Sequence, residues 1–454
     1  MGIFFILISL AFGAYGQADD YSVYTDAPRL ILTKARLRLV QRERERQSMR
    51  WQQFDALVAG GAPMPEPGFA HALYYRASGN LAWSRQAVEW ALTGASQDLR
   101  QLALVYDWCE MTDQQREQLG LKIERALAAA SSPADRAGQG ERGAAIEPAA
   151  VSRQSARALA AIAVADRLAD HGEATLRPLV DQWWRGDLAK RLQSGQTVIP
   201  RDQTYAFYEL LHAVRDNLKI DLREDAPGYF KLLPTDHLVS HYPTPFQTTE
   251  NEFRIPVYVR DGEPNLDDAA RSRAAELAMV AYDPNAADTQ FLQGWLMQDR
   301  FILRGALGSP YEFLWANPYQ PGLSYFQMPL VFHNATTGHL FARTSWDDGA
   351  TWIGYFDGTL QLFRDGTVQT LKPGAITEPV RVGGTVVLSV PTRDQARFRA
   401  DAEGIFVLGL TQRAMYEIEI DDQELDEAET DIGGTLVLSL PEGIDAGVRV
   451  RRRE

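Results

Sequence analysis

The stretch "NPYQPGLSYFQMP", residues 317–329, divides the chain into two parts with different sequence patterns. Before it, apolar residues recur every three or four positions, which is the period of amphipathic helices. After it, apolar and polar residues alternate, which is the period of β-strands. The prolines and the glycine within the stretch favour a connection that belongs to neither pattern. The sequence therefore predicts a helical part followed by a β part.

The helical patterns occur mostly in pairs that are separated by short breaks. These breaks carry Gly, Pro, Asn or Asp, as is typical between helices. Paired helices without a strict sequence repeat indicate hairpins arranged in a ring or a curved stack, and we therefore expect an incomplete (α/α) toroid. The predicted helices cover residues 34–47, 68–80, 81–94, 98–111, 112–130, 151–170, 174–184, 202–218, 266–282 and 288–303.

From Leu330 onward, short β-like runs are each bounded by Gly, Pro or Asp. This spacing is typical of antiparallel sheets. The predicted fold class is a multidomain α and β protein, in which the N-terminal toroid of helical hairpins is followed by a C-terminal antiparallel β-sandwich. The predicted divisions are a signal peptide over 1–16, a toroid domain over 17–325 and a sandwich domain over 326–454.

The composition limits the possible partners. The 454 residues include 46 Lys and Arg against 60 Asp and Glu, which gives a net charge of −14. This charge disfavours nucleic acid as a partner. It also disfavours a heavily sulfated polysaccharide, unless a local basic pocket offsets it. The one cysteine, Cys109, excludes an intrachain disulfide.

The first residues, "MGIFFILISLAFGAYGQADD", are typical of a secretory signal,. The apolar run from Ile3 to Gly13 is too short to span a bilayer. Because no Lys or Arg precedes it, an uncleaved membrane anchor is the alternative. We expect a secreted or periplasmic protein with no other membrane contact.

Three stretches carry a resemblance to a known group: "PRLILTKARLRLVQRER" from Pro28, "LALVYDWCEMTDQQREQL" from Leu102 and "RTSWDDGATWIGYFDG" from Arg343. They resemble the heparinase II/III-like and alginate-lyase group of secreted polysaccharide lyases. The resemblance implies a helical toroid, a β-sandwich and cleavage of a polysaccharide or oligosaccharide. It also implies histidines and an acid near a metal site after the third stretch. Residues 358–372, "GTLQLFRDGTVQTLK", contain no histidine, so no metal ligand is carried over.

Cleavage of a uronic acid chain by β-elimination needs three groups. A base removes the proton beside the sugar carboxylate, an acid protonates the leaving oxygen, and a third group neutralises the carboxylate. Tyr and His can fill the first two roles, and Asn, Gln, Arg or His the third. No cofactor or metal is required for this reaction, and none is expected.

The stretch "RDQTYAFYELLHAVRDN", residues 201–217, is the first candidate for this chemistry. On a helix, Tyr205, Tyr208, Glu209, His212 and Asp216 fall along one stripe. We expect Tyr205 and His212 to be catalytic residues on a helix that lines a cleft. The alternative is a helix with a solvated face.

The second candidate is "DHLVSHYPTPFQTTENEFRIPVY", residues 236–258, which is too irregular for one helix and is expected to be a binding loop,. His241 and Tyr242 are expected to transfer protons. A proline-braced connection between helices is the alternative. The expected substrate-binding residues are Asn251, Glu252 and Arg254 in this loop, with Tyr319 and Arg343 near the junction of the two parts.

Two other classes of function stay open. The protein can be a non-catalytic carbohydrate-binding or degenerate lyase-like protein, since the histidine-bearing strand is missing. It can also be a glycoside hydrolase, with two of Glu209, Asp216 and Glu252 facing a sugar. Two such carboxylates across one cleft favour hydrolysis, whereas a Tyr and His pair favours elimination. His333 and His339, which flank "NATTG", could face each other across a hairpin, but two histidines do not make a zinc site.

Overall fold

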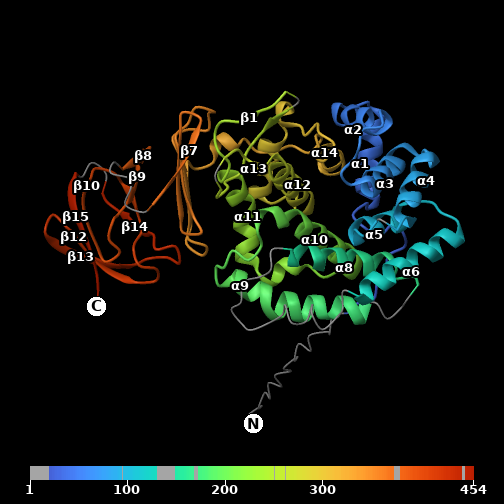
Figure 1. Ribbon diagram of the computed structural model, residues 1–454. Coiled ribbons are helices and arrows are strands. Elements are labelled where there is room, and N and C mark those ends of the chain that lie inside the picture. The colour runs from blue at the N-terminus through green and yellow to red at the C-terminus, as the bar shows by residue number, and fades with distance from the viewer. Residues whose placement is uncertain are drawn as a thin grey trace, which may run out of the picture.

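The computed structural model describes residues 20–94, 96–129, 149–167, 172–249, 251–260, 262–372, 379–441 and 445–453. The predicted signal peptide over 1–16 lies outside these ranges. Figure 1 shows a helical part, followed by a stack of sheets at its side. The predicted fold class, a helical toroid followed by antiparallel β structure, is confirmed. None of the helices in the described ranges is long and apolar enough to cross a membrane.

An inner ring of helices forms the centre of the helical part. Its members contact one another in chain order, and the last of them also contacts the first, so that the chain curves back on itself. These helices are α3 (Pro67–Ser78), α5 (Leu99–Trp108), α8 (Ala150–Ala163), α10 (Thr204–Leu218), α12 (Leu266–Tyr282) and α14 (Gly308–Trp315).

The remaining helices lie around this ring and complete the hairpins. They are α1 (Lys34–Glu45), α2 (Met49–Ala59), α4 (Leu81–Leu92), α6 (Asp113–Ala129), the π-helical segments η1 (Gly172–Leu176) and η2 (Pro178–Leu188), α9 (Ala189–Gln193), α11 (Pro227–Val239) and α13 (Ala287–Leu296). In the described ranges, 3₁₀ turns between helices are η3 (Arg201–Gln203), η4 (Leu222–Asp225) and η5 (Asp299–Phe301), and η6 (Tyr325–Gln327) precedes the first long strand.

Local sequence explains where several helices begin. Ser48 accepts a hydrogen bond from the backbone N of Trp51, and Asp98 accepts one from Gln101. Such side-chain caps satisfy backbone donors at a helix N-terminus. Inner helices are buried on nearly every side, as α5 is from Gln101 to Trp108. Such burial requires the nearly continuous apolar sequence that α5 has.

The described residues of the β part form three sheets. The first sheet has five strands in the order β3 (Val331–Asn334), β4 (His339–Arg343), β5 (Trp352–Phe356), β6 (Thr359–Arg364) and β7 (Thr367–Leu371). The second has the order β14 (Leu436–Ser439), β11 (Gly404–Leu408), β9 (Thr385–Ser389) and β8 (Val380–Val382). The third has the order β10 (Gln395–Ala400), β15 (Ala446–Arg452), β12 (Met415–Ile420) and β13 (Gln423–Glu429). All pairings are antiparallel except the parallel pair of β9 and β11.

The first sheet packs on both faces. Phe341 and Trp352 point toward the helices and belong to the same apolar core. Leu340 and Ile353, one position away along the same strands, pack against the second sheet, as the two-residue period of a strand requires. A separate core lies between the second and third sheets. The predicted sandwich is therefore a stack of three sheets whose first layer shares the core of the helices.

Some elements were not expected from the sequence. Helices α2, α9, α11 and α14 have no counterpart among the predicted helices, and residues 174–184 are π-helical. The stretch predicted as a loop over 236–258 begins inside α11 and continues into a short hairpin of β1 (Phe246–Gln247) and β2 (Glu252–Phe253). In α11, Pro227 stands at the first position and Pro234 lies inside the helix. Proline inside a helix is unfavourable, so the sequence around Pro234 does not indicate a helix.

Candidate functional site

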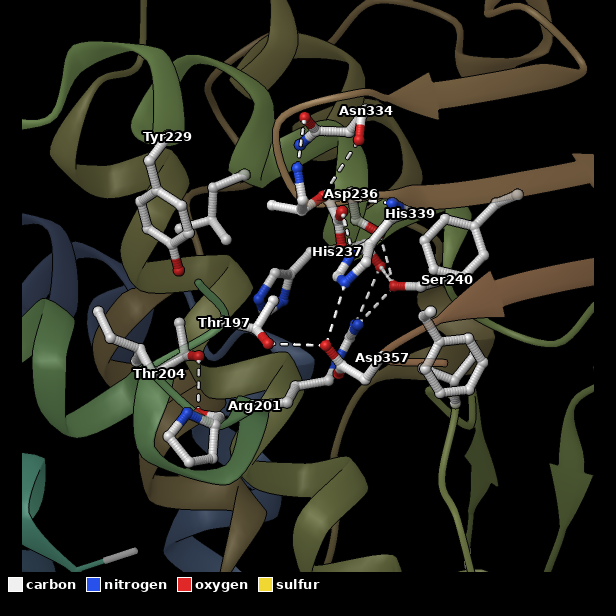
Figure 2. A pocket seen from close by; sticks show the side chains of 17 residues that line it. Thr197, Arg201, Thr204, Tyr229, Asp236, His237, Ser240, Asn334, His339 and Asp357 are labelled. Carbon is white, nitrogen blue, oxygen red and sulfur yellow. Dashed lines mark hydrogen bonds and ion pairs between the residues drawn. The ribbon is translucent and has the colours of Figure 1, made fainter. Parts of the chain in front are cut away.

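A cavity of about 150 Å³, lined by both apolar and ionisable side chains, lies where α11 and the segment before α10 meet the first sheet. We call it the seam pocket (Figure 2). Its volume is roughly five times that of a water molecule in the liquid, which is enough for a small polar group. Its ionisable and phenolic lining residues are Arg201, Tyr229, Asp236, His237, His339 and Asp357.

One face of α11 forms a wall of the seam pocket. Tyr229, Leu233, Asp236, His237 and Ser240 line the pocket, and their spacing of three or four residues places them on one side of the helix. Strand β4 forms the opposite wall. Side chains alternate between the two faces of a strand, and His339 lies on the face of β4 that meets α11. Polar residues of β4 and α11, which are far apart in the sequence, therefore meet across this seam.

His339 of β4 is held between two carboxylates. Its Nδ1 lies 2.9 Å from Oδ2 of Asp236, and its Nε2 lies 3.6 Å from Oδ1 of Asp357. Burial opposes a charge on His339, but the two carboxylates outweigh burial and raise its pKa to about 10,. In the same way, His339 lowers the pKa of Asp236 and of Asp357 in spite of their burial. At neutral pH, all three groups are therefore ionised.

A second charged pair lies beneath the pocket. Arg201 donates hydrogen bonds to Oε1 of Glu276 at 2.9 Å and to the carbonyl oxygen of His237 at 2.9 Å. Burial opposes ionisation of Glu276, but its contacts with His241, His237 and Arg201 lower its pKa to about 2. Because burial keeps both imidazoles neutral at pH 7, Arg201 is the cation beside this carboxylate. The cation and the carboxylate therefore compensate each other inside the protein.

His237 is the buried imidazole between these two pairs. Its side chain lines the pocket, and Nδ1 lies 3.5 Å from Oε1 of Glu276 without a hydrogen bond. Burial and the charge of Arg201 lower the pKa of His237, so the ring is neutral at pH 7. A proton on Nδ1, toward Glu276, leaves the lone pair on Nε2. His237 is thus able to act as a base.

Tyr229 supplies a phenol to the same space. Burial raises its pKa, so that the hydroxyl is protonated at neutral pH. Figure 2 shows Tyr229, His237, His339 and Asp357 around one space, with the helical residues on one side and the strand residues on the other. The pocket therefore combines a neutral imidazole, an imidazolium and a phenol.

The predicted catalytic residues of α10 do not line this pocket. His212 is buried, its Nε2 lies 3.1 Å from the carbonyl oxygen of Ala278, and its ring packs on Trp315. Burial lowers the pKa of His212 to about 3. Tyr205 donates a hydrogen bond of 2.6 Å to Glu209 inside the helical ring. The stripe that was expected to face a cleft is thus largely internal, and the catalytic roles of these residues stay predictions.

His241 and Tyr242 lie just behind the pocket. Nδ1 of His241 lies 2.7 Å from the carbonyl oxygen of His237, and its Nε2 lies 3.4 Å from Glu276. Tyr242 donates a hydrogen bond of 2.8 Å to Gln361 of β6. His241 thus contacts the charged pair under the pocket, whereas Tyr242 joins the loop to the first sheet.

The predicted substrate-binding residues are dispersed. Glu252 and Arg254 border a cavity of about 10 Å³ beside His241, and Asn251 is buried, with no hydrogen bond from its amide to any residue that the structure describes. Arg343 donates to the carbonyl oxygens of Val239 and His241, which ties β4 to the end of α11. Tyr319 lies in a different groove, beside α1. None of these five predicted residues lines the seam pocket.

The sequence patterns did not single out His237 or His339 as site residues. The expectation that His333 and His339 face each other is wrong, because Asn334 is the partner of His339 across the hairpin. His333 points to the opposite face, where it lies 2.8 Å from Asp431. Counting the two-residue alternation from the turn would have separated the two histidines. In the described part of the chain, no group of three or more His, Cys, Asp or Glu side chains is arranged to hold a metal ion.

No protein-family model matches the chain, and no curated protein matches it. Among solved structures, the fold is similar to that of a glycoside hydrolase with a TM-score of 0.30 and 8% identity, over 86% of this chain and 71% of that one. It is also similar to a mutant of heparan sulfate lyase HepC from Pedobacter heparinus, with a TM-score of 0.35 and 12% identity, over 85% of this chain and 75% of that one. Neither similarity assigns a reaction to this protein.

Proposed function

We propose that the protein is an exported carbohydrate-active enzyme, which cleaves a glycan containing uronic acid by β-elimination in the seam pocket. One observation carries this proposal. A neutral imidazole, His237, lines the same cavity as the imidazolium of His339, while the carboxylates that hold His339 are ionised. Elimination needs a base and a cationic group in one site.

In the proposed reaction, Nε2 of His237 takes the proton from the sugar carbon beside the carboxylate. The Nε2–H of His339 lies 3.6 Å from Oδ1 of Asp357 and makes no hydrogen bond in the described part of the chain. In the reaction it turns from Asp357 to the sugar carboxylate as negative charge moves onto that group. The bond from the neighbouring carbon to the glycosidic oxygen breaks and leaves a carbon–carbon double bond. Tyr229 gives its proton to the leaving oxygen. The proton on His237 then returns to Tyr229 through water, so that both groups regain their starting states.

Hydrolysis fits the pocket less well. A glycoside hydrolase of the common type needs one protonated carboxyl group as its acid. Both carboxylic acids of the seam pocket, Asp236 and Asp357, have a lowered pKa beside His339, so neither holds a proton at neutral pH. The carboxylates considered from the sequence, Glu209, Asp216 and Glu252, do not line the pocket.

The test is a turnover assay with the full chain and a panel of polyuronates. Cleavage by elimination generates unsaturated ends that absorb ultraviolet light. We expect His237→Ala and Tyr229→Phe each to lower kcat by about 10²- to 10⁴-fold, the usual contribution of a general acid or base. His333→Ala is the matched control, because this imidazole lies on the other face of the first sheet.

Each outcome has a definite meaning. New reducing ends without ultraviolet absorbance would identify a hydrolase and refute elimination. Full activity in His237→Ala, with the fold confirmed by circular dichroism, would place the reaction elsewhere. The absence of any product across the panel would favour the non-catalytic alternative.

A further inference from the structure

A second cavity, of about 790 Å³, lies between α1 and the segment over residues 317–321, which follows α14. We call it the α1 groove. None of its lining residues lines the seam pocket. In Figure 1, α1 lies on the side of the helical part that faces away from the sheets. The groove is therefore a separate surface, with a volume in the range of ligand pockets.

The charge of the α1 groove is opposite to that of the whole protein. Its charged lining residues are Arg36, Arg38 and Arg42, and no Asp or Glu lines it. The acidic residue next to them, Glu43, is buried and does not line the groove. In a chain with a net charge of −14, a cavity with three cations and no carboxylate attracts anions locally.

Two of these arginines have free hydrogen-bonding capacity. Neither Arg38 nor Arg42 makes a side-chain hydrogen bond or an ion pair with any residue that the structure describes. Many other surface arginines do, as the ion pairs of Arg399 with Asp445 and of Arg453 with Glu427 show. Each guanidinium carries five N–H donors, so the groove presents unused donors with positive charge.

An aromatic ring fixes the position of one of these two cations, Arg42. The guanidinium of Arg42 lies 4.0 Å from the centre of the Tyr319 ring, and that of Arg46 lies 5.1 Å from it. Such stacking orients a guanidinium without using its donors. Tyr319, which was expected from the sequence to bind a substrate, thus acts here as a support for arginine.

The other groove residues include Asn285, Gln290, Asn317 and Gln320. The amide of Asn317 bonds to that of Gln320, which donates to the carbonyl oxygen of Pro284, so the amide wall open to a ligand is that of Asn285 and Gln290. Amides both donate to and accept from hydroxyl groups. Arginines facing amides suit a ligand that bears anionic groups among many hydroxyls. Nucleic acid fits less well, because single strands stack their bases on exposed aromatic faces, and Arg42 and Arg46 occupy that of Tyr319.

We propose that the α1 groove is an accessory binding site for an anionic oligosaccharide that bears carboxylate or sulfate groups. It is independent of the reaction proposed for the seam pocket. Arg38 and Arg42 bind the anionic groups, and the amide wall binds the hydroxyls. The groove would hold an anionic chain on a protein whose overall charge repels it.

The experiment is isothermal titration of the full chain with three tetrasaccharides, one carboxylated, one sulfated and one neutral. His237→Ala serves as the background, so that turnover does not consume the probe. We expect an anionic tetrasaccharide to bind, with an affinity that falls as salt is added. Arg38→Gln with Arg42→Gln should weaken this binding at least about tenfold. Arg399→Gln with Arg453→Gln removes the same charge from the third sheet and should change it less than twofold.

The carboxylated and the sulfated probe distinguish the two kinds of anionic group. The proposal is overturned if neither binds, if the neutral probe binds as tightly, or if the Arg38 and Arg42 double variant binds as the control does. Equal or tighter binding of a single-stranded oligonucleotide would also overturn it. Tyr319→Ala, which removes the ring that supports Arg42 and Arg46 but keeps both charges, should weaken binding by a smaller factor than the double variant.

Discussion

At the scale of single residues, His339 makes a charged contact between the helical part and the first sheet. It lies on β4, and its partner Asp236 lies on α11. Both side chains are mostly buried, with exposed fractions of 12% and 17%. Removing one member of such a pair leaves the other as an uncompensated charge, which costs about 3–5 kcal/mol.

His339→Gln should therefore lower the free energy of unfolding by about 3 kcal/mol at pH 6. The loss should depend on pH. Because the folded state raises the pKa of His339 to about 10, its contribution is complete below its unfolded pKa of about 6.5 and disappears as pH rises through about 10. Chemical denaturation of both proteins between pH 6 and pH 10.5 measures this difference. A difference that stays constant over this range would contradict the assigned ionisation.

At the scale of elements, the connection that separates helices from strands packs directly on α13. An added Cβ atom at Gly294 of α13 would stand 1.9 Å from the carbonyl oxygen of Leu323. The amide of Gln293 donates hydrogen bonds to the carbonyl oxygens of Asn317 and Gln320. The stretch over 317–329 is thus held on α13 by a close backbone approach at Gly294 and by the side-chain amide of Gln293.

Gly294→Ala should consequently destabilise the protein by about 1–3 kcal/mol or more, since this is the usual cost of overpacking. The measurement is the denaturant midpoint at constant m-value. Gly228→Ala in α11 is the matched control, since a Cβ atom there meets nothing within 4 Å. In a helix, this change is expected to be neutral or stabilising by up to about 1 kcal/mol. Equal effects of the two substitutions would refute the close approach.

At the scale of the whole molecule, the apolar cores do not follow the change from helices to strands. The core of the helices extends into the first sheet through Phe341, Trp352 and Phe363. The core between the second and third sheets, which includes Ile405 and Val448, is a separate cluster. Elements that share a core tend to open together.

Hydrogen exchange under native conditions should reflect this division. We expect the amides of β4, β5 and β6 to exchange with the same opening free energy as those of α10 and α12. Those of β10, β12 and β15 should form a second group with a different value. Exchange measured by mass spectrometry at several denaturant concentrations separates the two groups. If β4–β6 exchanged with the third sheet instead, the shared core would not govern the opening.

The difference between local sequence pattern and tertiary packing explains which site residues were recognised from the sequence. The helix over 202–218 and its polar stripe were predicted, and α10 forms there. Whether that stripe faces solvent, a cleft or the interior depends on neighbouring helices, and Glu209 is fully buried. His237 was hidden in a stretch read as a loop, because Pro234 interrupts the helical pattern of α11.

The sequence by itself determined the change from helices to strands, the hairpin pairing of the helices and the strongly acidic charge. Periodicity and turn residues act over a few neighbouring positions, so they can be read along the chain. The seam pocket, the pKa of His339 and the three-sheet stack were decided only by the tertiary structure. They depend on which faces meet: Asp236 and His339 are 103 residues apart in the chain, and only the packing of α11 on β4 places their charges 2.9 Å from each other.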